Sequence, residues 1–228
     1  MSFGYGWRGP NIVKDGLVFY IDPGSPNSYN RFLNNSTTLN DISGNINPGS
    51  LINGSSYSTD GSGSIDFDGT DDYISYGAVS SLSSTSFTMC FWIKPNFSLI
   101  SGFGTVAGYD GNRRILIRTS DSRLLSQLSG NHFSTAGSIV NNTWQQVVYK
   151  YDNSENLEYW YINGTFNISR TPTGVTPVWN QSFYFGRYTL STIYIYGGYI
   201  SQSMFYNRAL SATEVLQNYN ATKTRFGL

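Results

Sequence analysis

The chain is poor in the residues on which most catalytic and metal sites depend. Its 228 residues include one cysteine, one histidine and three glutamates. A single cysteine, Cys90, excludes an intrachain disulfide framework, and its apolar surroundings predict a buried structural thiol. One cysteine and one distant histidine do not supply the four ligands of a zinc site.

Charge and long apolar runs are scarce as well. Charged residues make up 12% of the chain and the formal net charge is zero. We therefore expect no long-range attraction to nucleic acid or to an acidic membrane surface. No run approaches the roughly 18 apolar residues of a membrane helix. The start at Met1 lacks the basic and apolar regions of a secretory signal, so we expect none.

Aromatic residues, in contrast, are plentiful. They reach 16% of the sequence, with eighteen tyrosines, and aromatic side chains favour β-strands, sugar-stacking surfaces and protein interfaces. A length of 228 residues suits one large all-β domain, because sandwiches of this size are usually single domains.

The stretch from Gly63 to Tyr76 predicts two short strands around a sharp turn. Ile65 and Phe67 lie two apart and share one face, while Asp68-Gly69 ends the first strand. Asp71 and Asp72 follow, and we interpret them as caps of the turn rather than as metal ligands.

Further strands are predicted where apolar and aromatic residues alternate, and Asn163-Gly164 predicts a type I′ hairpin turn. The polar region 25–64 fits a compact fold only if it wraps the domain as short edge strands. Ser211 and Glu214 form a capping box that starts the one good helix. The main predicted strands are Gly16–Asp22, Phe87–Pro95, Val106–Leu128 as a hairpin, Trp144–Tyr151, Leu157–Gly164, Ser182–Tyr188 and Ile193–Tyr206.

Four motifs in this order resemble the laminin-G-like domains of the concanavalin A-like lectin/glucanase superfamily. They are the Asp-Gly turn after Phe67, the Phe87-to-Pro95 strand with its Trp and Lys-Pro, the Trp144 strand followed by Tyr-Ile-Asn-Gly164, and Tyr206 to Tyr219. The resemblance implies an all-β fold, a jelly-roll sandwich of two antiparallel sheets with one short C-terminal helix. On this basis residues 1–15 form an N-terminal arm, 16–220 the sandwich and 221–228 a C-terminal tail.

Catalysis is not expected. The family's glycanases carry Glu-x-Asp-x-x-Glu on one strand, and this spacing is absent here. Glu158 is the only glutamate on its predicted strand, and His132 lies in a turn-like Ser-Gly-Asn-His-Phe stretch, where we expect a solvated side chain. The sequence also lacks a Gly-x-Ser-x-Gly elbow that would support a catalytic triad.

The resemblance implies one structural calcium ion, with Asp22 at the end of the first strand as a ligand. The second family aspartate is missing from Gly198–Ser203, and Asp41 is the candidate that would compensate. No other cofactor is expected. Sugar stacking would need exposed rings, although strand alternation places about half of them in the core. The candidates are Tyr159, Trp160, Tyr161, Tyr194 and Tyr196.

The opening segment carries Phe3, Tyr5 and Trp7 between glycines, either as a loose leader or as an arm that docks on other proteins. Together with Gly16–Asp22, it resembles structural proteins of tailed bacteriophages, especially those that infect cyanobacteria. The resemblance implies a non-catalytic virion protein, a capsid decoration or tail component assembled in the host cytoplasm. It would bind other virion proteins or further copies of itself, and its loops would contact host glycans. The alternative is a carbohydrate-binding or adhesion module of a cellular protein.

Overall fold

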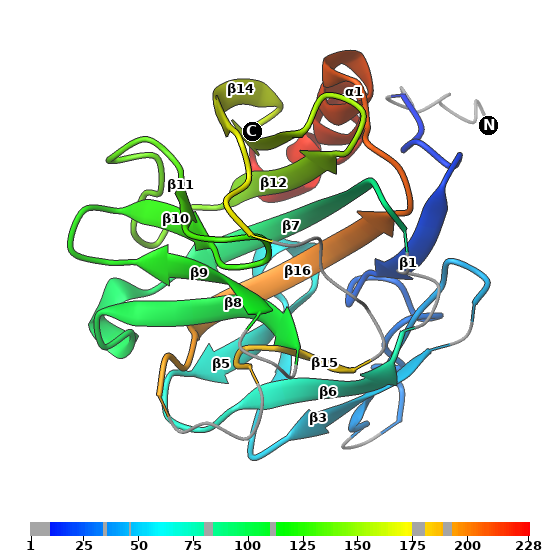
Figure 1. The fold of residues 1–228 in the computed structure, drawn as a ribbon. Coiled ribbons are helices and arrows are strands. Elements are labelled where there is room, and N and C mark those ends of the chain that lie inside the picture. Colours follow the sequence, from blue (N-terminus) through cyan, green and yellow to red (C-terminus); the bar gives the residue numbers. More distant parts are fainter. Residues whose placement is uncertain are drawn as a thin grey trace.

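The structure is a computed structural model. It describes residues 10–33, 36–45, 47–79, 84–109, 113–174, 181–188 and 193–228. Two antiparallel sheets, each with eight strands among these residues, pack face to face (Figure 1). The all-β sandwich predicted from the sequence is confirmed.

Sheet A has β16 near its centre, because β16 pairs with β7 along one edge and with two strands along the other. β5 takes the first half of that second edge and β1 takes the second half. The strands in spatial order are β14 (Thr165–Arg170), β13 (Leu157–Ile162), β12 (Gln145–Asp152), β7 (Phe87–Pro95), β16 (Gly197–Tyr206), β5 (Ser64–Asp68) and β4 (Ser56–Ser58), with β1 (Leu17–Ile21) beside β16.

Sheet B covers the other side of the core. Its strands in spatial order are β11 (His132–Phe133), β10 (Arg123–Ser126), β9 (Arg113–Arg118), β8 (Phe103–Tyr109), β15 (Ser182–Phe185), β6 (Tyr73–Ala78), β3 (Pro48–Ile52) and β2 (Thr38–Asn40). The polar region 25–64 therefore does wrap the domain, since it supplies β2, β3 and β4 to sheet edges.

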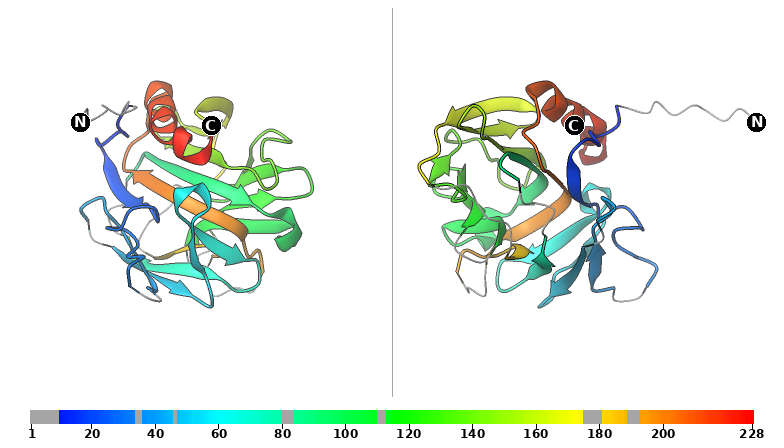
Figure 2. Two further views of the ribbon diagram at one scale, coloured as in Figure 1. Left: turned by 180° about the vertical axis from the view of Figure 1, so that it is seen from behind. Right: turned by 45° about the vertical axis from the view of Figure 1, so that its right-hand side comes forward.

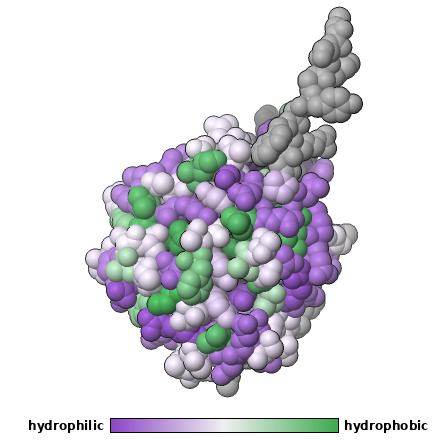
Figure 3. Space-filling view, turned by 90° about the horizontal axis from the view of Figure 1, so that it is seen from above, coloured by the Kyte–Doolittle hydropathy of each residue, from purple (hydrophilic) through white to green (hydrophobic). Residues whose placement is uncertain are grey.

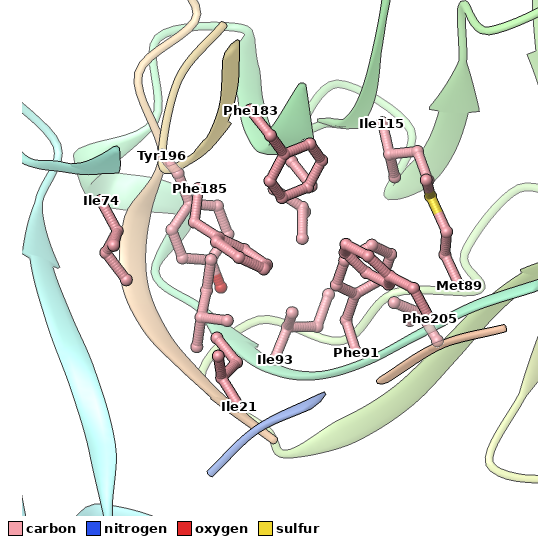
Figure 4. Close-up of a cluster of buried hydrophobic side chains, with 14 of the residues drawn as sticks. Ile21, Ile74, Met89, Phe91, Ile93, Ile115, Phe183, Phe185, Tyr196 and Phe205 are labelled. Carbon is pink, nitrogen blue, oxygen red and sulfur yellow. The ribbon is translucent and has the colours of Figure 1, made fainter. Parts of the chain in front are cut away.

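Aromatic rings fill the space between the sheets. Phe205 on β16 stacks on Phe19 of β1 at 4.9 Å between ring centroids, and Phe183 of β15 meets it edge-on at 5.2 Å. Figure 4 shows how side chains from both sheets converge on this cluster. Burial of many large rings in this core explains why the chain has many aromatic residues and few charged ones.

Strand β7 shows the predicted alternation, and both of its faces are buried. Phe87, Met89, Phe91 and Ile93 point into the inter-sheet core. Cys90 and Trp92 face the other way, beneath the C-terminal helix α1 (Ala212–Thr222) and the short 3₁₀ helix η4 (Lys223–Phe226). Figure 2 shows α1 and the C-terminus lying on the outer side of sheet A.

The local signals for turns and caps are also confirmed. Asn163 and Gly164 both have positive φ (50° and 74°), as a type I′ turn requires. Ser211 and Glu214 form the complete capping box of α1. Two further 3₁₀ turns, η1 (Asp60–Ser62) and η3 (Phe97–Leu99), lie in connections. Among the described residues, no helix has the length and apolarity that crossing a membrane requires.

Both ends of the described chain pack on the sandwich. Val13 is buried, and its backbone N–H donates to Asn218 Oδ1 of α1 at 2.8 Å. Phe226 is buried against Trp92, with ring centroids 4.0 Å apart. Val13 of the predicted arm and Phe226 of the predicted tail therefore both pack on the sandwich.

Candidate functional site: a rim cavity beside Tyr194

The structure separates the five predicted sugar-stacking residues by exposure. Trp160 and Tyr196 are 0% exposed and lie in the inter-sheet core, so neither ring has a face for a ligand. Tyr161 is 4% exposed and packs on the outer side of sheet A. Tyr159 and Tyr194 are partly exposed and remain candidates.

Tyr159 is largely occupied by its neighbours. The Lys150 ammonium lies 3.8 Å from its ring centroid, and Phe166 meets it edge-on at 6.4 Å. Its hydroxyl donates to Glu155. Tyr159 does not line a cavity, whereas Tyr194 does.

Tyr194 lines a cavity of about 440 Å³ at the rim of the sandwich. Phe103 enters from the start of β8, and Gly69 and Thr70 belong to the turn between β5 and β6. The full lining is Gly69, Thr70, Ser101, Phe103, Ile193, Tyr194 and Ile195. A few polar groups beside aromatic and aliphatic walls are typical of small-molecule sites.

The backbone holds Tyr194 in an unusual conformation. Its φ is +59°, a left-handed value that costs a bulky residue of order 1–3 kcal/mol. Its carbonyl accepts the N–H of Thr105 at 2.8 Å, and its ring meets Phe103 edge-on at 5.3 Å. These contacts fix the ring at the cavity wall.

An arginine lies directly behind this ring. The Arg114 guanidinium is 4.9 Å from the Tyr194 ring centroid and 3.7 Å from that of Tyr188. Its Nε donates to Gln127 Oε1 at 2.6 Å, while its Nη1 is buried without a hydrogen-bond partner. Among the described residues it has no ion-pair partner, and its guanidinium lies against the ring that lines the cavity.

The turn that supplies Gly69 and Thr70 is acidic. Asp68, Asp71 and Asp72 each place one carboxylate oxygen within 4.8 Å of the others. Asp72 Oδ2 accepts the backbone N–H of Asp68 at 2.9 Å, which confirms its predicted capping role. Burial, then the charges of Asp68 and Asp71, raises the pKa of Asp72 to about 6. Asp68 and Asp71 are exposed, so they can accept hydrogen bonds from ligand hydroxyls beside the cavity.

The candidate calcium ligands do not fit a cation. Asp22 Oδ1 is ion-paired with Arg225 Nη1 at 2.5 Å, and Oδ2 accepts from Gln202 Nε2 at 2.8 Å. Asp41 Oδ1 accepts the N–H groups of Tyr20 and Ser43, and Oδ2 accepts an amide N–H of Asn47. Calcium requires oxygen ligands, whereas each of these oxygens faces a nitrogen donor.

The predicted docking residues Phe3, Tyr5 and Trp7 lie outside the described residues. The described chain begins at Pro10, which is exposed, and Asn11 accepts from Gln217 of α1 at 2.7 Å. Seen from above, the surface around α1 and β14 carries its apolar residues as separate small patches among polar ones (Figure 3).

The prediction of a solvated His132 is wrong. His132 is 2% exposed on β11, and its Nδ1 lies 2.8 Å from Glu158 Oε2. The sequence places Glu158 and Trp160 two apart, on one face of β13, but does not show that this face is the buried one. A buried glutamate needs a partner, and in the structure that partner is His132.

Comparisons with known proteins support the fold described above. Domain 4 of AbnA, an extracellular arabinanase from Geobacillus stearothermophilus solved with arabinotriose, superposes with a TM-score of 0.68 at 21% identity, over 89% of this chain and 98% of that one. The receptor-binding domain of botulinum neurotoxin C/D mosaic serotype gives 0.69 at 16% identity, over 91% of this chain and 51% of that one.

A sialidase from Trypanosoma rangeli, solved with 2,3-difluorosialic acid, gives a TM-score of 0.68 at 12% identity. The match covers 92% of this chain and 34% of the sialidase chain. At these identities the likenesses show the fold. A search of curated proteins gives no match.

A family model matches residues 68–216, which is about two thirds of the chain and includes the acidic turn, Phe103 and Tyr194. The protein belongs to the laminin-G-like family of the concanavalin A-like lectin/glucanases superfamily.

Proposed function

We propose that the protein is a non-catalytic glycan-binding module and that the rim cavity holds the sugar. The observation that carries the proposal is the Tyr194 ring, fixed at the wall of an open cavity next to the exposed carboxylates of Asp68 and Asp71. A pyranose or furanose ring would stack on Tyr194 and Phe103, and its hydroxyls would bond to Thr70, Ser101 and the acidic turn.

The positions of the glutamates argue against hydrolysis by a glutamate pair at the rim cavity. Glycoside hydrolysis uses two carboxyl groups on opposite sides of the bond to be cleaved. Glu158 is bonded to Tyr149 and His132, and Glu214 to Arg208 and Ser211. Glu155 accepts from Tyr159. None of the three lines the rim cavity.

The glycan proposal is tested by binding of the full chain to a glycan array, followed by titration calorimetry with the best ligand. Tyr194→Ala should lower the affinity by at least about tenfold, or 1.4 kcal/mol. Tyr159→Ala is the matched control, since it removes another partly exposed tyrosine away from the cavity. An array without any ligand, or equal losses in the two variants, would contradict the proposal.

We propose further that the module is displayed on a phage particle, attached through residues 1–9. Support comes from the sequence resemblance of the opening segment and from Pro10–Val13, which bring the chain to the surface beside α1. Mass spectrometry of purified particles tests the location. Removal of residues 1–9 should abolish attachment while leaving Val13 and the fold intact. A protein that is absent from particles belongs instead to a cellular adhesion or carbohydrate-binding system.

A further inference from the structure

A second polar cluster joins the two sheets and shares no residue with the rim cavity. His132 comes from β11 of sheet B, whereas Glu158 and Tyr149 come from β13 and β12 of sheet A. Glu158 Oε2 lies 2.8 Å from His132 Nδ1, and Oε1 accepts the Tyr149 hydroxyl at 2.6 Å. Both carboxylate oxygens are therefore engaged.

Trp160 contacts both the backbone and the ring of His132. Its indole N–H donates to the His132 carbonyl at 3.2 Å, and the two ring centroids are 6.3 Å apart. Glu158 is 1% exposed and His132 is 2% exposed. Removing two ionisable groups from water is costly unless they pair, and here they pair with each other across the space between the sheets.

A cavity of about 310 Å³ opens above this pair. Its size falls at the lower end of the range for small-molecule sites, roughly 300–1,000 Å³. Every lining residue is polar or glycine, which separates it from the aromatic rim cavity. The lining is Gly130, Asn131, His132, Glu158, Arg170, Thr171 and Thr173.

The cavity has two functional groups that its own residues leave unused. His132 Nε2 is buried and, like Nδ1, has no hydrogen-bond partner among the described residues. Arg170 is exposed at the end of β14, directly opposite Glu158 in the strand pairing, and has no ion-pair partner among the described residues. A buried polar atom without a partner is rare in folded proteins and needs an explanation.

The Arg170 guanidinium and His132 Nε2 indicate which chemical groups a ligand of this cavity would carry. A guanidinium pairs best with a carboxylate, which accepts two parallel hydrogen bonds. The imidazole Nε2 can form a hydrogen bond with a ligand hydroxyl. The hydroxyls of Thr171 and Thr173 and the Asn131 amide can bond to further hydroxyl groups.

We propose that this cavity is a second binding site, for a small sugar acid that carries one carboxylate and several hydroxyl groups. Arg170 binds the carboxylate, and His132 Nε2 bonds to a ligand hydroxyl. Tyr149 acts as a positioning residue, because it bonds to Glu158 beside the imidazole and does not line the cavity. The proposal is independent of sugar binding beside Tyr194, since the two cavities share no residue.

The single histidine makes the test direct, because the ring signals of His132 are the only histidine signals in an NMR spectrum of the isotope-labelled chain. D-Glucuronate is titrated as the probe, with D-glucose as its neutral match. We expect saturable shifts of the His132 signals with glucuronate and affinity at least about tenfold weaker for glucose.

Arg170→Gln should weaken glucuronate binding by at least about tenfold. It lies at an exposed strand end, so the variant keeps its fold. Arg31→Gln is the control, because Arg31 is also exposed and lies far along the chain, beside Phe32. Tyr194→Ala should leave these shifts unchanged. No saturable shift, equal affinity for glucose, or equal binding by Arg170→Gln and Arg31→Gln would overturn the proposal.

Discussion

Arg225 and Asp22 are 203 positions apart in the chain and form an ion pair of 2.5 Å. Asp22 follows β1, and Arg225 belongs to η4 at the C-terminus. The same guanidinium donates to the carbonyls of Gly61 and Gly63 at 2.7 and 2.6 Å. One side chain thus joins the C-terminus to the first strand and to the segment before β5, at the place where family resemblance suggested calcium.

Arg225→Met should lower the free energy of unfolding by about 2–4 kcal/mol, because it leaves the Asp22 carboxylate buried without its cation. Chemical denaturation measures the loss. The double variant with Asp22→Asn should recover part of it, since the unpaired charge is then gone. If the double variant is no more stable than Arg225→Met, the pair has no net electrostatic role. Calcium should not raise the stability of the unmodified protein through Asp22.

The raised pKa of Asp72 predicts an unusual dependence of the protein's stability on pH. Its pKa is raised from 3.8 to about 6, chiefly by burial. Between these values the folded state holds a proton that the unfolded state has released. The contribution of Asp72 to stability is therefore fully present below pH 3.8 and is lost as the pH rises through 6.

Asp72→Asn should remove this pH dependence and stabilise the protein at pH 7, on the order of 1 kcal/mol. The asparagine Oδ1 can still accept the Asp68 N–H, so the turn is kept. Denaturation of both proteins from pH 4 to pH 7.5 measures the difference. A constant offset between the two curves would show that the carboxyl group does not titrate in this range.

The contribution of Glu214 to stability should have the opposite dependence on pH from that of Asp72. Its pKa is lowered from 4.5 to about 2, first by the Arg208 guanidinium and also by Ser211 of the capping box. The stabilisation is present above pH 4.5 and is lost as the pH falls toward 2.

Glu214→Gln should therefore cost about 1 kcal/mol at pH 7 and little at pH 2.5. Ser211→Ala removes the other half of the capping box, and its cost, also about 1 kcal/mol, should depend less on pH. Thermal unfolding at both pH values compares the variants. Equal losses for Glu214→Gln at the two pH values would contradict the ionic contribution.

Local features of the fold could be predicted from the sequence because they are encoded in neighbouring residues. The alternation in β7, the Asp68-Gly69 turn and the capping box of α1 each depend on residues a few positions apart. Strand alternation also says that one face of β7 is core. It could not predict that α1 and η4 cover the other face, so that both faces of β7 are buried.

The site depended on contacts between distant residues and was harder to predict. Trp160 and Tyr161 are neighbours, yet Trp160 lies between the sheets and Tyr161 on the outer side of sheet A. Periodicity shows that they differ and does not show which ring is exposed. The Glu158 pair with His132 and the Arg225 pair with Asp22 join different elements, so no local pattern reveals them.

Tyr194 allows backbone strain and ligand binding to be measured separately. Its φ of +59° suits glycine, so Tyr194→Gly relieves a conformational cost that Tyr194→Ala keeps. Both variants lose the contacts of the ring with Phe103 and Arg114 and should lose glycan binding to the same extent. Tyr194→Gly should nevertheless be more stable than Tyr194→Ala, by about 1 kcal/mol. Denaturation and calorimetry on the two proteins give both numbers. If the glycine variant binds as the unmodified protein does, the ring is not the sugar platform, and if it is the less stable of the two, the left-handed backbone is not strained.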